Sequence, residues 1–277
     1  ITLAVTVLMV LGGLWCAKLY QDKKAKKPLV LTARVKRLYV VMAVTYTLVC
    51  LGIVSWIPWP YALCLFPPLL PLWTALAGLL AWPIEKLISE MYFRDAQRKL
   101  KERPDLIKIG ITGSYGKTSV KFILGTLLKE KYQVLVTPAS FNTPMGVTKV
   151  IREKLRPAHQ VFVAEMGARH VGDIKEMCRL VHPTLGVLTS VGPQHLDTFR
   201  TLDRIKHTKY ELMDAIPADG CCFFPDDGGI CRELYDQTQK PRRRVSLTDP
   251  TADVWAEDIA VSPEGSTFLL HAGDKQI

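Results

Sequence analysis

Residues 109–120 read IGITGSYGKTSV, and this stretch decides the fold of the second half of the chain. Apolar residues alternate through 107–112, which predicts a short strand, and recur at helical spacing through 117–130, which predicts a helix. Between them, Gly113 and Gly116 let backbone N–H groups turn inward without a Cβ clash. The positive end of the helix dipole lies at the same place. The stretch therefore predicts a loop that binds phosphate groups.

The side chains that follow the second glycine suit a nucleotide. Lys117 would reach the β- and γ-phosphates, and the Thr118 hydroxyl would bind Mg²⁺. The spacing is T-G-x-x-G-K-T and departs from the common GxxxxGK[ST], because position 111 is Ile. The alternative is a glycine-rich turn without a nucleotide. The residues expected to contact the nucleotide here are Gly113, Ser114, Tyr115, Gly116, Lys117, Thr118 and Ser119.

The rest of the second half alternates between strand and helix patterns. This alternation predicts an α/β fold of the P-loop type, a mostly parallel sheet flanked by helices. Short strands and turns at 243–277 suggest an antiparallel edge. The expected strands are 132–137, 160–166, 184–191 and 220–224, and the expected helices are 146–155, 170–181 and 201–216.

The first 84 residues are apolar and predict a membrane region with about three transmembrane helices. Residues 1–17 carry no charge, nor do the 47 residues 38–84, which are long enough for two spans. We expect spans near 1–17, 39–57 and 62–82, and the first could instead be the core of a signal peptide. The seven cysteines show no metal-ligand spacing and receive no role.

The segment 18–37 holds eight basic residues and one acidic residue, in a chain of net charge +10. Short basic loops stay in the cytoplasm, so this pattern predicts a multi-pass plasma-membrane protein with a cytoplasmic catalytic domain. The charge fits a solvated linker or contact with anionic membrane lipids, and nucleic-acid binding is not needed to explain it. The chain starts at Ile1 and ends within a pattern, so we expect a longer protein, truncated at its C-terminus. The expected domains are the membrane region 1–84, a charged linker helix at 85–104 and an ATP-binding domain at 105–277.

The T-G-x-x-G-K-T loop resembles that of the Mur ligase family, and four further segments support the resemblance over about 105–277. Their order and spacing are similar to the branch that adds D-alanyl-D-alanine to a UDP-N-acetylmuramoyl peptide. The segments are FNTPMGV at 141–147, VAEMGARHVGDI at 163–174, TSVGPQHLDTF at 189–199 and HTKYELM at 207–213.

The resemblance implies ATP, two Mg²⁺ ions and roles for four further residues. Glu165 ends an apolar strand beside the loop, where a carboxylate can hold Mg²⁺, although a charge at the sheet rim is the alternative. His195 matches the family's metal-binding histidine, and Lys209 matches a lysine that becomes an anionic carbamate. Asn142 would lie near the acyl phosphate and completes the set of residues expected to bind the nucleotide. The catalytic set is therefore Lys117, Lys209 and His195, and the metal set is Thr118, Glu165, His195 and Lys209.

The implied activity is ATP-driven amide formation through an acyl phosphate, between a UDP-linked peptide and an amino acid or dipeptide. Two departures matter: apolar residues stand where the family has a soluble UDP-binding domain, and FFPDDGG at 223–229 keeps only Asp-Asp of the usual Asn-Ala-Asp segment. A poly-γ-glutamate-type ligase and a nucleotide-binding membrane scaffold without ligase activity therefore stay open. Arg169 and His170 are further substrate-side candidates, whereas His159, His182 and His271 are interpreted as ordinary.

Overall fold

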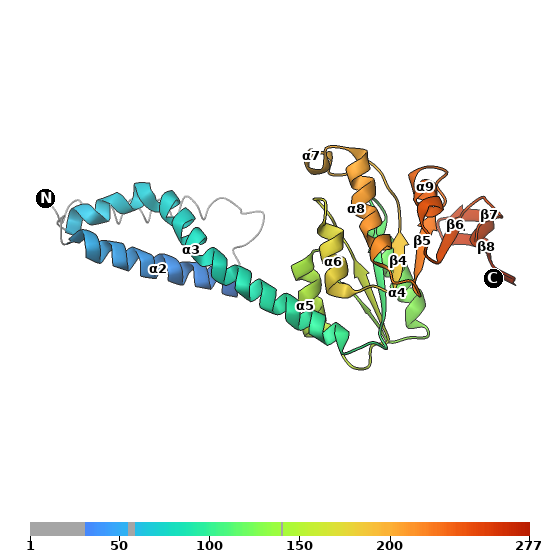
Figure 1. Cartoon of the computed structure of the whole chain (residues 1–277), viewed down its shortest axis with the longest axis horizontal. Coiled ribbons are helices and arrows are strands. Elements are labelled where there is room, and N and C mark those ends of the chain that lie inside the picture. Colours follow the sequence, from blue (N-terminus) through green and yellow to red (C-terminus); the bar gives the residue numbers. More distant parts are fainter. Residues whose placement is uncertain (1–30, 55–58, 140) are drawn as a thin grey trace. The chain divides into compact units, whose positions relative to one another are not determined.

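The computed structural model describes residues 31–54, 59–139 and 141–277, which divide into two compact units, 1–89 and 90–277 (Figure 1). In the first unit, α2 (Ala33–Val54) and the first part of α3 (Trp59–Lys101) are helical. Within this unit, Arg37 Nε donates a hydrogen bond of 2.6 Å to Glu85 Oε1. The charged helix predicted from residue 85 is the C-terminal part of α3.

The prediction of a multi-pass membrane location is contradicted. Within the ranges that the structure describes, none of the helices has the length and apolar character needed to cross a membrane. The span predicted near 1–17 lies outside the described residues.

The second unit is built on a nine-stranded sheet in the order β2-β3-β1-β4-β5-β6-β7-β8-β9. Strands β2 to β7 pair in parallel, and β8 and β9 add an antiparallel edge, which confirms the predicted mostly parallel sheet and its edge. The strands are β1 (Ile107–Thr112), β2 (Val134–Val136), β3 (Val161–Glu165), β4 (Leu185–Leu188), β5 (Cys221–Pro225), β6 (Arg242–Ser246), β7 (Val254–Ser262), β8 (Gly265–Ala272) and β9 (Lys275–Gln276).

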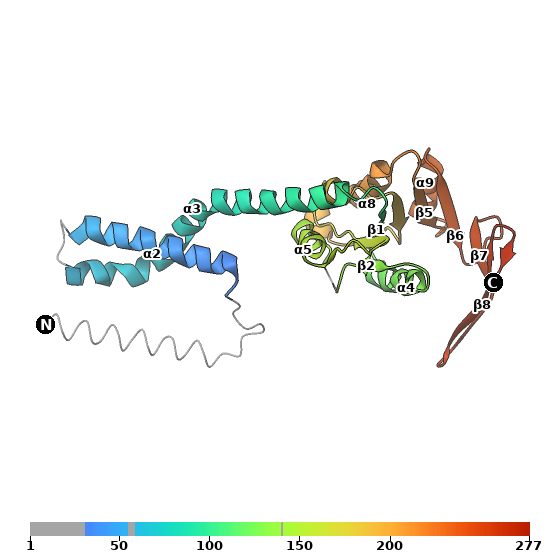
Figure 2. The same cartoon turned by 90° about the horizontal axis from the view of Figure 1, so that it is seen from below.

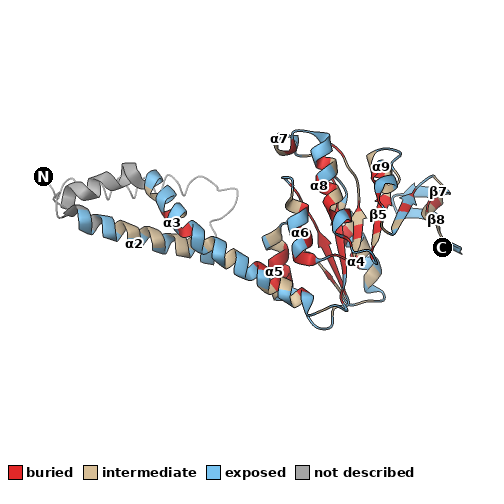
Figure 3. Ribbon diagram, viewed as in Figure 1, coloured by how far each residue is buried: buried red, intermediate tan, exposed pale blue. Residues whose placement is uncertain are grey.

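Helices cover both faces of this sheet (Figure 2). One face packs against α4, in a small core that includes Ile109 and Ile111. The other face carries the larger core, to which α5, α6 and α8 contribute; β3 is buried along its whole length and β1 from its second residue onward (Figure 3). The helices are α4 (Lys117–Lys129), α5 (Pro144–Lys154), α6 (Asp173–Val181), α7 (Leu196–Phe199), α8 (Leu202–Ala215) and α9 (Ile230–Gln237).

Local sequence explains where several of these elements begin. Thr143 and Thr201 cap α5 and α8, and each threonine hydroxyl accepts a hydrogen bond from a backbone N–H three residues later. The C-terminal part of α3 belongs to the second unit, because Phe93, Ala96 and Leu100 are buried in the larger core. The loops that follow β1, β3 and β4 all lie at the carboxyl edge of the parallel strands, which brings the segments singled out in the sequence to one place.

Candidate active site

The predicted phosphate loop connects β1 to α4. Gly113 and Gly116 have φ values of 148° and 78°, in the region that favours glycine. A Cβ at Gly113 would lie 2.1 Å from Thr189 Oγ1, so the close approach of the two loops also requires glycine there. Lys117 is the first residue of α4, and its ammonium donates to the Gly113 and Ser114 carbonyl oxygens at 2.6 and 3.0 Å. The loop therefore has the backbone geometry that phosphate binding requires.

The loop is held in place by the segment that follows β4. The backbone N–H of Ser114 donates to the Ser190 carbonyl at 2.9 Å, and its hydroxyl donates to the Gly192 carbonyl at 2.9 Å. The Tyr115 hydroxyl donates to the Pro193 carbonyl at 3.0 Å. These bonds connect residues more than 70 positions apart, so the loop shape is set by tertiary structure as well as by its glycines.

Glu165, at the end of β3, is the centre of a buried polar cluster. Its side chain is almost fully buried, and its Oε2 accepts hydrogen bonds from Thr118 Oγ1 at 3.0 Å and Lys121 Nζ at 2.8 Å. Oε1 accepts from Asn142 Nδ2 at 3.1 Å. Burial acts to raise the pKa of this carboxyl, but the hydrogen bonds from Lys121, Asn142 and Thr118 outweigh burial and lower its pKa. Glu165 is thus an ionised carboxylate beside the loop.

In contrast to Glu165, Lys209 on α8 is buried without a partner among the described residues. Only 2% of it is exposed, and no hydrogen bond or ion pair reaches its ammonium from the residues that the structure describes. Burial, with the charge of Lys117 as a second cause, lowers its pKa to about 8, although Asp173 and Glu211 act in the opposite direction. Roughly a tenth of this amine is therefore neutral at pH 7, on the order of a hundredfold more than for an ordinary lysine.

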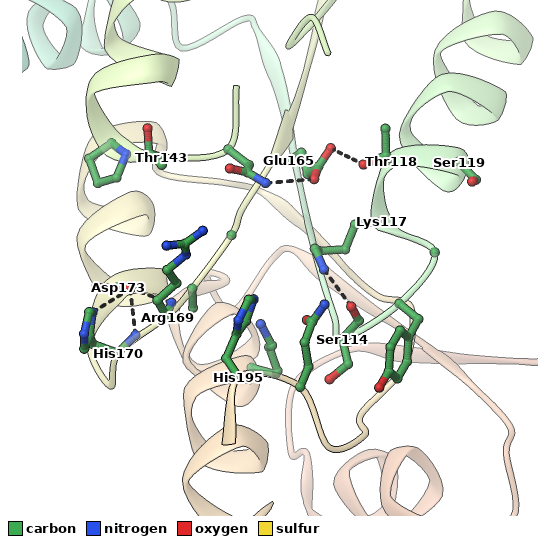
Figure 4. A pocket seen from close by; sticks show the side chains of 18 residues that line it. Ser114, Lys117, Thr118, Ser119, Thr143, Glu165, Arg169, His170, Asp173 and His195 are labelled. Carbon is green, nitrogen blue, oxygen red and sulfur yellow. Dashed lines mark hydrogen bonds and ion pairs between the residues drawn. The ribbon is translucent and has the colours of Figure 1, made fainter. Parts of the chain in front are cut away.

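Figure 4 shows how the predicted side chains converge on one cavity of about 600 Å³, here called the loop pocket. His195, which precedes α7, is exposed and has a left-handed φ of 54°. Arg169 and His170 reach the pocket from the β3–α6 loop, where both backbone N–H groups donate to the Asp173 carboxylate at 2.8 and 2.9 Å. The predicted residues that line the loop pocket are Ser114, Tyr115, Gly116, Lys117, Thr118, Ser119, Asn142, Glu165, His195 and Lys209, with Gly113 in the adjoining loop.

Sequence reasoning missed Lys121, which is fully buried against Glu165. A signal existed, because Lys121 lies four residues after Lys117 and so shares its helix face. It also missed Asp173 and Glu211, which hold the start of α6: Glu211 accepts from the backbone N–H groups of Gly172 and Lys175 at 2.9 and 2.8 Å. His159 and His271 have ordinary partners, a backbone N–H and Glu257 respectively.

The donor set fits Mg²⁺ only together with a nucleotide. Across the described ranges, no group of three or more His, Cys, Asp or Glu residues could hold a metal ion alone. Thr118 and Glu165 place a hydroxyl and a carboxylate oxygen 3.0 Å apart beside the loop. Mg²⁺ is usually bound by one or two protein oxygens together with phosphate oxygens and water, so this pair is adequate for it.

Comparisons with known proteins agree with this geometry. Residues 111–277 match the model of the Mur ligase middle domain. Over 169 residues the chain is 35% identical to the UDP-N-acetylmuramoyl-tripeptide–D-alanyl-D-alanine ligase of Mycobacterium bovis, covering 61% of this chain and 33% of that protein.

Solved structures are similar as well. The chain matches MurF from Acinetobacter baumannii with a TM-score of 0.61 and 28% identity, covering 68% of this chain and 41% of that one. MurF from Thermotoga maritima, solved in complex with ADP, matches with the same TM-score and identity and is covered over 43% of its length. The chain spans about a third of the length of the curated relatives that it matches. With the family model matched over most of its length, this chain belongs to the Mur ligase family.

Proposed function

We propose that this chain is the ATP-binding part of an ADP-forming ligase that joins a carboxylate to an amine. One observation carries the proposal: the loop pocket brings Lys117 and Thr118 of a phosphate loop together with an ionised Glu165 and a buried, partner-free Lys209. The relatives named as UDP-N-acetylmuramoyl-tripeptide–D-alanyl-D-alanine ligases favour a UDP-linked muramoyl peptide and D-alanyl-D-alanine as substrates, in peptidoglycan precursor synthesis.

The chemistry assigned to the pocket proceeds in two steps. A carboxylate oxygen of the first substrate attacks the γ-phosphorus of ATP, the bond to the β-phosphate oxygen breaks, and ADP leaves. The amine of the second substrate then attacks the acyl carbon, loses a proton and releases inorganic phosphate. Lys117 and the loop N–H groups stabilise the charge that develops on the phosphate oxygens. The surrounding walls must exclude water, which would hydrolyse the acyl phosphate.

Mg²⁺ would be held by Thr118 and Glu165, with His195 and a modified Lys209 as candidate ligands of a second ion. Bound there, it would neutralise negative charge on the transferring phosphate. Lys209 can serve as a ligand only after its amine has added to CO₂ and lost a proton, which gives an anionic carbamate. Its lowered pKa of about 8 supports this assignment, because only the neutral amine attacks CO₂. Asn142 is assigned to positioning Glu165, to which it donates.

The experiment measures ADP release by the full-length protein with ATP and Mg²⁺. Release that requires both the UDP-muramoyl tripeptide and D-alanyl-D-alanine is expected, and Lys117→Ala should reduce it at least 100-fold. Release driven instead by glutamate would move the assignment to a poly-γ-glutamate-type ligase. ATP binding without release with either substrate pair would overturn the ligase assignment in favour of a nucleotide-binding scaffold.

The carbamate is tested separately by NMR with ¹³C-labelled bicarbonate. A carbamate carbon signal is expected at pH 8 in the wild-type protein and should be absent in Lys209→Met. A wild-type spectrum identical to that of Lys209→Met would remove Lys209 from the ligand set.

A further inference from the structure

A second cavity lies at the amino edge of the sheet, away from the loop pocket. It has a volume of about 370 Å³ and is lined by Leu100, Lys101, Pro104, Lys108 and His182; we call it the basal pocket. Lys108 is near the start of β1, and the phosphate loop follows the end of the same strand. Thr112 is four residue steps along the strand from Lys108, or about 13 Å at roughly 3.3 Å per residue. The two pockets therefore lie at opposite ends of β1.

Lys108 is unusual because it is buried without a counter-charge. It is 9% exposed, and across the described part of the chain its ammonium has no hydrogen bond or ion pair. Burial lowers the pKa of this ammonium, and the nearby Asp105 only partly offsets the effect. Asp105 is itself engaged, since Arg103 donates to both of its carboxylate oxygens at 2.7 to 3.2 Å. Because Lys108 lines the basal pocket, an anion bound there would supply the counter-charge that no described protein group supplies.

Lys101 and His182 are the other basic residues that line the basal pocket. Burial and the charges of Lys108 and Lys101 all lower the pKa of His182. The three basic side chains therefore lie near one another around a common space, and among the described residues no acidic side chain lines the pocket. His182, interpreted as ordinary from the sequence, lies beside two lysines whose charges, with burial, favour its neutral imidazole.

The backbone fixes these groups before any ligand arrives. Thr184 N–H and its hydroxyl both donate to the Lys108 carbonyl, at 2.8 and 3.2 Å, so β1 is tied to the turn after α6. His182 ends α6 in a left-handed conformation with φ of 49°, and its N–H donates to the Cys178 carbonyl at 2.8 Å. These bonds fix the backbone positions from which Lys108 and His182 reach the cavity.

We propose that the basal pocket is a binding site for a small phosphorylated compound, separate from the nucleotide site. Two lysines and a histidine donate N–H groups to one phosphate group, and hydrogen bonds to an ionised acceptor are the strong ones. Leu100 and Pro104 supply apolar wall against which an organic part of the ligand packs. A phosphate dianion fits better than a carboxylate, because it offsets the charges of both lysines and its own charge favours protonation of His182.

The test uses inorganic pyrophosphate and the full chain with Lys117→Ala, which weakens phosphate binding at the loop. Pyrophosphate should raise the thermal midpoint, and it should also raise the pKa of the His182 imidazole followed by NMR. Adding Lys108→Met should weaken both effects at least tenfold, whereas Lys275→Met, which removes an equal charge from an exposed strand, should leave them unchanged. Because Lys117→Ala is present throughout, the outcome does not depend on ligase activity.

Lys101→Met serves as a second variant, since this exposed side chain is not needed for packing. It should weaken pyrophosphate binding several-fold. Without pyrophosphate, Lys108→Met should have a higher thermal midpoint than its parent, because an unpaired buried charge is removed, and the order should reverse as pyrophosphate is added. A pyrophosphate effect that survives both Lys108→Met and Lys101→Met, or no saturable effect on His182, would overturn the proposal.

Discussion

Two buried lysines on opposite sides of the loop pocket have opposite surroundings. Lys121, on α4, is fully buried and paired with Glu165 at 2.8 Å, whereas Lys209, on α8, is equally buried and lacks a partner among the described residues. A buried pair whose remaining atoms are hydrogen-bonded is a structural element. A buried amine without a partner destabilises the fold and is free to react. We infer that the α4 side of the pocket, with Lys121, maintains its shape, and that the α8 side, with Lys209, is available for chemistry.

The largest expected effect comes from breaking the Lys121 pair. Lys121→Met leaves the Glu165 carboxylate buried without its counter-charge, which should lower the free energy of unfolding by roughly 3–5 kcal/mol. Urea unfolding at pH 7 measures it. Lys129→Met, on the exposed end of the same helix, is the matched control and should change little.

A double variant sharpens the interpretation. Lys121→Met with Glu165→Met removes both charges and should recover most of the stability lost in the single variant, because no unpaired buried charge remains. Equal losses in the single and double variants would show that the packing of the lysine stem, and not its charge, stabilises the pocket.

Arg244 extends the comparison to a paired cation outside the pocket. It is 5% exposed, and its guanidinium donates to Asp226 at 2.7 Å, to Asp249 and to Thr251 at 2.7 Å. Arg244→Met should lower the urea midpoint less than Lys121→Met does, because Asp249 is partly exposed and can be hydrated. The neighbouring Arg243→Met, at an exposed pair, is the control. If Arg244→Met lowers the urea midpoint as much as Lys121→Met does, the burial of the carboxylate left behind does not determine which variant is less stable.

The sequence predicted the individual elements and residues of this site better than it predicted which side chains pair with one another. Local patterns were enough for the strands, the phosphate loop and the strand-end position of Glu165, since alternation and glycine spacing are properties of neighbouring residues. The pairing of Lys121 with Glu165 joins residues 44 positions apart, which no local pattern specifies. The basal pocket depends in the same way on how the end of α3 packs beside β1 and the turn after α6.

The membrane prediction failed for a related reason. It counted uncharged apolar residues along the chain, whereas no helix in the described ranges has the length and apolar character of a membrane span. Hydropathy along a sequence does not show where a helix begins and ends. The site predictions relied instead on the pattern of the phosphate loop and on the resemblance of four further segments to the Mur ligase family.

The pH dependence of the unfolding free energy tests whether Lys209 is buried without a partner. Its pKa falls from the ordinary 10.5 to about 8 in the folded protein, so the unfolded chain binds more protons between these pH values. Stability should therefore rise with pH across this window, by about 1–3 kcal/mol for this group.

The measurement is the difference in urea unfolding between wild type and Lys209→Met from pH 7 to 10.5. Lys108 and Lys117 also have lowered pKa values and contribute slopes of the same sign, so only the difference reports on Lys209. Lys209→Met should be the more stable protein at pH 7, with the gap closing as pH rises. A constant gap would mean that Lys209 is not desolvated.

The smallest effect is expected at Lys206, one turn before Lys209 on the same helix. Its ammonium pairs with Glu233, whose side chain is 53% exposed, so water solvates both charges when the pair breaks. Lys206→Ala should lower the free energy of unfolding by only about 0.5 kcal/mol, and 0.5 M NaCl should remove most of that difference. Three lysines would then differ in the order Lys121, Lys209 and Lys206 because of solvation and pairing, not residue type. A loss above about 2 kcal/mol at Lys206 would break that ordering, since an exposed pair would then contribute as much as a buried one.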